Sequence, residues 1–191
     1  MSDILPLKGV RVLEVSQGWA TPLCGQLLVD LGADVVKLAA SDTDDPVDAL
    51  GEDEAVFARH ALDAGKCVLP LADQSDESVS ALLGRADVVL GDRQILDRTG
   101  IAGRLGPATV VCAVSPFGSD GPLAEHVASD FTIQAASAIM ATTGERGGGP
   151  IRAGTELGAA VAALYGTIGI TAALIERLRS SLGQFVDTRQ S

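Results

Sequence analysis

The longest apolar stretch of the sequence lies near its C-terminal end. Residues Leu157–Ile175 carry no charge, and basic residues follow at Arg177 and Arg179. The run is long enough to cross a membrane, but it is mostly Ala, Gly and Thr, with few of the large apolar side chains that favour lipid. Small side chains let neighbouring elements approach closely. The pattern therefore predicts a helix that is buried on most of its circumference within the protein.

Start and stop signals flank this predicted helix. Thr155 follows Gly154 and is a candidate cap for the first turn. Gly183 is a candidate stop, and the basic residues before it suit the negative end of the helix dipole.

The N-terminal part has a strand–helix–strand pattern. Val10–Val15 is a short apolar run that predicts a strand, and Asp34–Leu38 predicts the next. Between them, Thr21 and Pro22 are typical of a helix start, and Gly32 of a helix end. A β-α-β unit this compact implies parallel strands joined by a right-handed crossover.

Three more short apolar runs predict strands at Cys67–Leu71, Ala86–Leu90 and Ala108–Val114, with a helix at Ser75–Leu83. The alternation indicates an α/β fold with a mostly parallel, Rossmann-like sheet of about five or six strands and flanking helices. We expect residues 1–150 to form this domain. Residues 151–191 should continue the same domain as the central buried helix and a C-terminal tail.

Composition narrows the possible functions. Hydrophobic residues make up 47% of the chain, which is typical of a globular protein. The net charge of −11 and the lack of a basic run argue against a nucleic-acid partner. The N-terminus lacks the apolar segment of a signal peptide, so we expect a cytoplasmic protein with no membrane partner. The two histidines are isolated, and the three cysteines form no CxxC pair, so no metal site is expected.

Several segments share a pattern with one known protein family. The opening LKGVRVLEV and the later QLLVDLGADVVKL match it, as do Gly169–Leu174, Arg177 and Gly183-Gln184 in the central run. The loop Ser115–Pro122 and the segment Ser129–Ser137 match as well. The chain thus resembles the N-terminal half of the family III CoA-transferases, the carnitine dehydratase and bile-acid-inducible F-like (CaiB/BaiF) group.

This resemblance implies acyl-CoA chemistry and locates its nucleophile. The family attacks an acyl-CoA thioester with an Asp carboxylate, and an acceptor acid then takes the acyl group. The alignment puts that Asp at Ala159, whose methyl group cannot attack. Glu156 lies three residues earlier, on the same helix face, and is a weak candidate for a substitute nucleophile.

The resemblance also implies positions for a CoA site, and the sequence departs from the family at several of them. Ala39 stands where a Glu is usual, Asp92 where an Asn is usual and Arg93 where an aromatic residue is usual. The acidic stretch Asp42–Glu54 is expected to be a solvated loop that disfavours an anionic nucleotide. CoA or acyl-CoA is therefore an expected but weak ligand. The implied contacts are Gln17, Ala20, Lys66, Asp92, Arg93, Arg104 and Gly118.

Three functions remain open. In the first, the chain is a CoA-transferase-like domain that is catalytically silent alone. In the second, it is an active transferase, racemase or lyase that uses Glu156 or a partner's carboxylate. In the third, it is a structural or regulatory subunit that does not bind CoA. Family members are interlocked dimers of longer chains, so the resemblance implies a homodimer or a heteromer with a catalytic family III half.

Overall fold

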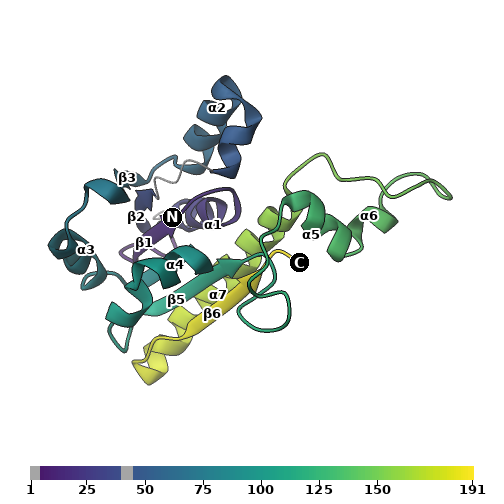
Figure 1. Cartoon of the computed structure of the whole chain (residues 1–191). Coiled ribbons are helices and arrows are strands. Elements are labelled where there is room, and N and C mark those ends of the chain that lie inside the picture. The colour runs from purple at the N-terminus through teal and green to yellow at the C-terminus, as the bar shows by residue number, and fades with distance from the viewer. Residues whose placement is uncertain (1–4, 40–44) are drawn as a thin grey trace.

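The computed structural model describes residues 5–39 and 45–191, and within them six parallel strands form one sheet (Figure 1). The strand order is β3-β2-β1-β4-β5-β6, and every neighbouring pair is parallel. The predicted Rossmann-like α/β fold is confirmed. The strands are β1 Arg11–Ser16, β2 Asp34–Ala39, β3 Cys67–Pro70, β4 Val88–Asp92, β5 Val110–Ser115 and β6 Phe185–Arg189.

The predicted strands are present, with ends shifted by one or two residues. β6 was not predicted as a strand, because Asp187 and Arg189 interrupt its short apolar pattern. It pairs with β5 at the edge of the sheet. Residues after 150 therefore add a strand to this sheet and a helix, α7, that packs on it.

Helices cover both faces of the sheet. The α-helices are α1 Ala20–Asp30, α2 Glu52–Leu62, α3 Asp76–Leu83, α4 Arg93–Thr99, α5 Asp130–Ala136, α6 Ile139–Thr142 and α7 Leu157–Ser180. Short 3₁₀ turns are η1 Pro46–Leu50, η2 Leu71–Asp73 and η3 Ile101–Arg104. Ser75 caps α3 by accepting a hydrogen bond from the Ser78 amide. The predicted Thr21 cap is wrong: α1 begins after Trp19, and the Thr21 hydroxyl instead donates to Asp92.

Helix α7 begins and ends differently from the prediction. Its N-cap position is Glu156 rather than Thr155, and neither side chain caps it. The Gly158 amide instead donates to the carboxylate of Asp130 on α5, which supplies the missing acceptor. The helix ends at Ser181, which adopts a left-handed conformation. Gly183 lies further on, where a side chain would collide with the Thr109 carbonyl.

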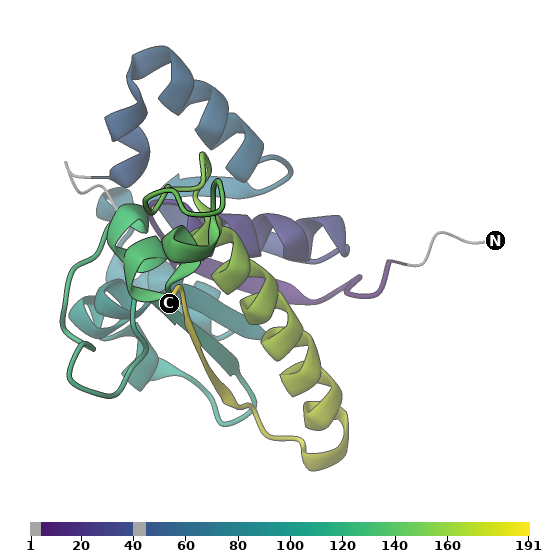
Figure 2. The same ribbon diagram turned by 90° about the vertical axis from the view of Figure 1, so that its right-hand side faces the viewer.

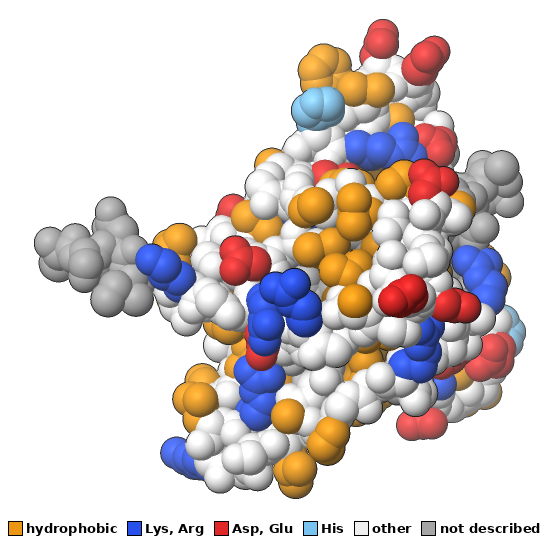
Figure 3. Space-filling model, turned by 90° about the vertical axis from the view of Figure 1, so that its left-hand side faces the viewer, with side chains coloured by type: hydrophobic (Ala, Val, Ile, Leu, Met, Phe, Trp, Pro, Cys, Tyr) orange, Lys and Arg blue, Asp and Glu red, His pale blue; other side chains and the backbone are white. Residues whose placement is uncertain are grey.

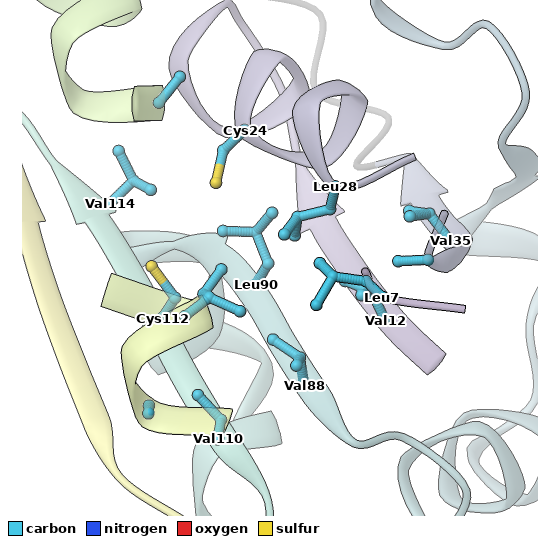
Figure 4. Close-up of a cluster of buried hydrophobic side chains, with 14 of the residues drawn as sticks. Leu7, Val12, Cys24, Leu28, Val35, Val88, Leu90, Val110, Cys112 and Val114 are labelled. Atoms are coloured by element: carbon cyan, nitrogen blue, oxygen red, sulfur yellow. The ribbon is translucent and has the colours of Figure 1, made fainter. Parts of the chain in front are cut away.

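The two sides of the sheet have separate cores. On one face α1 and α7 pack over the sheet, and the core includes Cys24, Leu28, Leu90 and Cys112 (Figure 4). Burial raises the pKa of both thiols, that of Cys24 to about 12, so both are unreactive at neutral pH. On the other face α3 and α4 cover a core around Leu13, Val89 and Leu96. Each strand therefore sends alternate side chains into different cores.

The connections through α1 and through α7 differ in hand. Helices α1 and α7 lie on the same face of the sheet, yet β1 to β2 and β5 to β6 step in opposite directions along the strand order (Figures 1 and 2). The two crossovers must therefore have opposite hands. Since β1–α1–β2 is expected to be right-handed, like nearly all such units, we expect the long β5–α7–β6 connection to be left-handed, which is rare in parallel sheets.

Helix α7 is buried on one side only. Its small residues, among them Ala162, Ala163 and Gly166, face the sheet and α1. The prediction that it is buried on most of its circumference is wrong. Large side chains stand exposed along its outer face, and we call them the α7 stripe: Val161, Leu164, Tyr165, Ile168, Ile175 and Leu178. By length and composition α7 could span a membrane, but half of its most apolar window is buried in this domain, as in the core helix of a globular protein.

The acidic stretch is only partly as predicted. Residues 40–44 lie outside the described residues, but η1 and the start of α2 occupy the rest, so it is not simply a loop. Asp45 accepts hydrogen bonds from the Gly18 and Val47 amides. Arg59 of α2 forms ion pairs with Asp48 and Asp45, at 2.6 and 3.6 Å. These contacts hold part of the acidic charge in place.

Candidate functional site

The carboxyl ends of the parallel strands meet at one edge of the sheet, where α7 begins. Such an edge is the usual ligand site of a parallel α/β sheet. A cavity of about 350 Å³ opens there, and we call it the α7 pocket. Its lining comes from the start of α1, the start of α5, the segment before α7, and the end of β6. The residues are Trp19, Ala20, Pro46, Ala128, Ser129, Asp130, Phe131, Arg152, Glu156, Ala159 and Gln190.

Ala159 lies in the wall of this pocket. It is in the first turn of α7 and is 4% exposed, and Ala20 of α1 lines the same cavity. The preceding Gly158 fits tightly, since a side chain there would meet Ile133 and the Gln190 carbonyl. The start of α7 is thus fixed by close packing, and its position 159 presents only a methyl group to the pocket.

Two carboxylates and one guanidinium stand beside Ala159, and we call Asp130, Arg152 and Glu156 the rim cluster. Arg152 binds Asp130 at 3.0 Å and Glu156 at 2.9 Å. The Asp130 carboxylate is almost fully buried and also accepts hydrogen bonds from Gln134 and the Gly158 amide. The cluster has one more negative than positive charge, so an anionic ligand is not favoured here without rearrangement.

Glu156 is the more adaptable of the two carboxylates. Burial, and next the charge of Asp130, raise its pKa, while Arg152 opposes the shift. About a third of its side chain is exposed, whereas that of Asp130 is sealed. Glu156 is thus the carboxylate that can turn into the α7 pocket, although Arg152 holds it in this structure.

A second cavity, of about 180 Å³, adjoins the first along the ends of β1, β4 and β5, and we call it the β4 pocket. It brings together three of the predicted CoA contacts, Gln17, Asp92 and Arg93. The guanidinium of Arg93 is paired with Asp97 of the same helix at 2.6 Å. The Gln17 side-chain oxygen is buried without a hydrogen-bond partner in the described part of the chain.

Asp92 ties the turn after β1 to the start of α1. Its carboxylate accepts the Gln17 amide at 2.9 Å and the Thr21 hydroxyl at 2.5 Å. Burial raises the pKa of Asp92 to about 7, against the lowering effect of these two hydrogen bonds. At neutral pH this group is therefore poised between the acid and the carboxylate, where the family's Asn would stay neutral.

The remaining predicted CoA contacts are placed differently. Ala20 lines the α7 pocket, and Gly118 lies beside Arg189 at the same edge of the sheet. Lys66 is sealed beneath α1, where its ammonium donates to Glu14 and to the Pro22 carbonyl at 2.8 Å each. Arg104 reaches Ser80 and Asp76 of α3. The structure thus gathers Gln17, Ala20, Asp92 and Arg93 around the two pockets, and does not bring Lys66 or Arg104 to them.

Several residues of the site were not assigned from the sequence, among them Asp130, Arg152 and Trp19. Arg152 and Glu156 both lie before the first residue of α7, so helical spacing does not mark them as an ion pair in the sequence. Trp19 is the one tryptophan of the chain and directly follows the turn at the end of β1, which could have marked it. Among the described residues, no group of three or more His, Cys, Asp or Glu is placed to hold a metal ion.

A parallel sheet with two pockets at its carboxyl edge, beside the start of α7, is typical of α/β domains that bind ligands at this edge. Comparison with known proteins gives the class: residues 7–191 match CoA-transferase family III, so the chain belongs to that family. The succinate–glutarate CoA-transferase of Agrobacterium fabrum is 33% identical over 201 residues, covering 95% of this chain and 50% of that protein. The formyl-CoA:oxalate CoA-transferase of Streptomyces avermitilis is 31% identical, covering 95% and 47%.

Solved structures agree with this assignment. A CaiB/BaiF family protein from Brucella suis superposes with a TM-score of 0.85 at 31% identity, covering 98% of this chain and 54% of that one. A hypothetical protein from Mycobacterium tuberculosis has the same fold, with a TM-score of 0.76 at 24% identity over 97% and 54% of the two chains. The chain thus spans about half the length of the relatives that it matches.

Proposed function

We propose that this chain is a family III CoA-transferase-type domain that presents the carboxyl-edge pockets to an acyl-CoA ligand but does not transfer acyl groups alone. The observation that carries the proposal is the methyl group of Ala159 in the wall of the α7 pocket. The names of the relatives describe CoA transfer between thioesters and carboxylic acids. In that chemistry a carboxylate attacks the thioester carbonyl, a mixed anhydride forms and the CoA thiolate leaves.

A methyl group cannot perform this step, whereas the residues around it can still bind. Trp19, Ala20 and Ala159 offer apolar wall, and the orphaned oxygen of Gln17 can accept a hydrogen bond from a ligand amide. The nearby acids Asp92, Asp97 and Glu125 oppose the phosphates of CoA. We therefore expect CoA to bind weakly, with a dissociation constant on the order of 0.1–1 mM, equivalent to about −4 to −5.5 kcal/mol.

A second candidate function is an active transferase that uses Glu156. It is favoured by one observation: Glu156 lines the same pocket as Ala159 and has a raised pKa. Against it stands the ion pair with Arg152. A nucleophile must be free and correctly aligned, so this ion pair would have to open before Glu156 could attack. A third possibility is a subunit that has lost CoA binding altogether.

We further propose that a partner covers the α7 stripe. The side chains of Leu164, Tyr165, Ile168 and Leu178 are 54–85% exposed, and large contiguous apolar patches are unusual on monomers. The partner is a second copy of this chain or a catalytic family III half that supplies the missing carboxylate. Light scattering at micromolar concentration tests the homodimer. A stable monomer that binds no hydrophobic dye would contradict the proposal that a partner covers the α7 stripe.

Two assays test the proposal as a whole. With succinyl-CoA as donor and glutarate as acceptor, the pair named for one relative, we expect no turnover above background. Calorimetric titration with CoA should give weak binding that Trp19→Ala reduces, because the indole forms part of the pocket wall. Turnover that Glu156→Gln abolishes would favour the second candidate, and an absence of CoA binding would favour the third.

A further inference from the structure

A third cavity lies at the opposite edge of the sheet, away from the pockets described above. Its volume is about 300 Å³, and it is formed where β1 and β2 begin and α3 ends. We call it the amino-edge pocket. It is lined by Arg11, Val12, Leu13, Asp34, Val36, Leu82, Arg85 and Ala86. None of these residues lines the α7 pocket or the β4 pocket, and the cavity is at the lower end of the size range of small-molecule sites.

The floor of the amino-edge pocket is apolar. Leu13 of β1 and Val36 of β2 point toward the α3 face, and Leu82 of α3 closes the cavity from above. Figure 3 views the molecule from the side of α3 and β3. Hydrophobic side chains gather near the middle of this face, next to a group of basic side chains. An apolar floor that remains open to solvent favours a ligand with a hydrocarbon part.

The rim of the pocket is basic in an otherwise acidic protein. Arg11 and Arg85 stand at the rim with one acid, Asp34, although the whole chain has a net charge of −11. Arg85 is exposed, and its guanidinium makes no ion pair or hydrogen bond within the described part of the chain. Arg11 uses its Nε to bind Asp87 at 3.1 Å, and half of its side chain remains exposed. Two guanidinium groups therefore have donors available at the mouth of an apolar cavity.

We propose that the amino-edge pocket binds a single-chain amphiphile with an anionic head. The hydrocarbon tail packs on Leu13, Val36 and Leu82, and the head accepts hydrogen bonds from Arg85 and Arg11. Arginine recognises carboxylate and phosphate oxygens alike, so both heads share this chemistry. The site is independent of acyl transfer, because it lies at the other edge of the sheet from Ala159.

The test is an amide NMR titration of the full chain with octanoate, octyl phosphate and octanol as probes. We expect both anions to shift the amides of Val36, Leu82 and Ala86, and octanol to bind more weakly. Arg85→Glu should weaken octanoate binding by roughly fivefold, as expected for reversal of one exposed charge, and the effect should shrink at high salt. Which anion binds tighter identifies the natural head group.

Two variants keep the test decisive. Arg146→Glu makes the same charge change at an exposed loop position outside the pocket and should leave binding unchanged. Leu82→Phe fills the cavity from α3 and should weaken all three probes. The proposal is overturned if octanol binds as tightly as octanoate, if Arg85→Glu and Arg146→Glu behave alike, or if the shifted amides map to the α7 stripe.

Discussion

Two clusters in this protein pair a single cation with carboxylate groups, one cluster in the buried interior and the other beside a pocket that is open to solvent. Beneath α1, Glu14, Ser16 and Lys66 form what we call the sealed cluster, in which the side chains of Glu14 and Lys66 are both 0% exposed. At the start of α7, the rim cluster joins Arg152 to Asp130 and Glu156, with Arg152 39% exposed. The first is closed to any ligand, and the second faces a pocket.

The same kind of ion pair thus stabilises the fold where it is fully buried, and can contact a ligand where it is partly exposed. Burial lowers the pKa of Lys66 and raises that of Glu14, and each group opposes the shift of the other. Gly25 of α1 passes so close to the Glu14 carboxylate that any side chain would collide with it. The sealed cluster therefore positions α1, whereas the rim cluster can exchange partners.

The largest effect is expected from breaking the sealed cluster. Lys66→Met keeps the length of the side chain but leaves the Glu14 carboxylate buried without its cation. We expect the free energy of unfolding to fall by about 3–5 kcal/mol. Urea denaturation measures it, with the exposed Lys8→Met as the matched control. Adding Glu14→Gln should recover part of the loss, and a loss below about 1 kcal/mol would contradict the assignment of this pair.

A smaller effect with a distinct pH profile is expected at Asp92. Its folded pKa of about 7 lies above the unfolded value of 3.8, so its contribution to stability is full below pH 3.8 and is lost as the pH rises through 7. Asp92→Asn should therefore be more stable than the native chain at pH 8, by about 1–3 kcal/mol, and this difference should shrink toward pH 4. Thermal unfolding at the two pH values measures it. A constant difference would contradict the raised pKa.

Opening the rim cluster should reduce stability less than breaking the sealed cluster does. Arg152→Gln removes the cation of Asp130, but Gln134 and the Gly158 amide remain as donors. Solvent also reaches the cluster, so we expect a loss of stability roughly a third of that for Lys66→Met. The urea midpoint measures it. A loss of stability equal to that of Lys66→Met would show that the rim cluster contributes as much to the stability of the fold as the sealed cluster.

The smallest effect on stability is expected for Glu156→Gln. The side chain is partly exposed and shares Arg152 with Asp130, so its loss leaves no buried charge unpaired. We expect an unfolding midpoint within experimental error of the native chain. A clear destabilisation would mean that Glu156 is held in place and cannot turn into the pocket.

Local patterns predicted much of the fold. The apolar runs predicted five of the six strands, and the helix predicted at Ser75–Leu83 corresponds to α3, which Ser75 caps. The missed strand, β6, is a half-exposed edge strand whose charged residues hide the pattern. The uncharged run did not reveal that α7 has one buried and one exposed face, because the absence of charge does not distinguish buried Ala and Gly from exposed Leu and Ile. Their spacing would have done so.

The site was harder to predict, because its contacts join distant parts of the chain. Lys66 was assigned to CoA, but its partner Glu14 lies 52 residues earlier and the pairing is visible only in three dimensions. The Asp130 contact to the Gly158 amide spans 28 residues and replaces the predicted Thr155 cap. By contrast, Gln17 and Asp92 lie together at the edge of the sheet, because Gln17 follows β1 and Asp92 ends the neighbouring strand β4.

The central claim, that position 159 leaves this chain without a nucleophile, can be tested directly by trapping the acyl-enzyme. The chain is incubated with succinyl-CoA, treated with hydroxylamine and digested with a protease. The masses of its peptides are then measured by mass spectrometry. A carboxylate that forms a mixed anhydride is converted to a hydroxamate, which changes the mass of its peptide. We predict no such change in the peptide that carries Glu156 and Ala159. A hydroxamate on that peptide in the native chain, absent in Glu156→Gln, would contradict the account and identify Glu156 as the nucleophile.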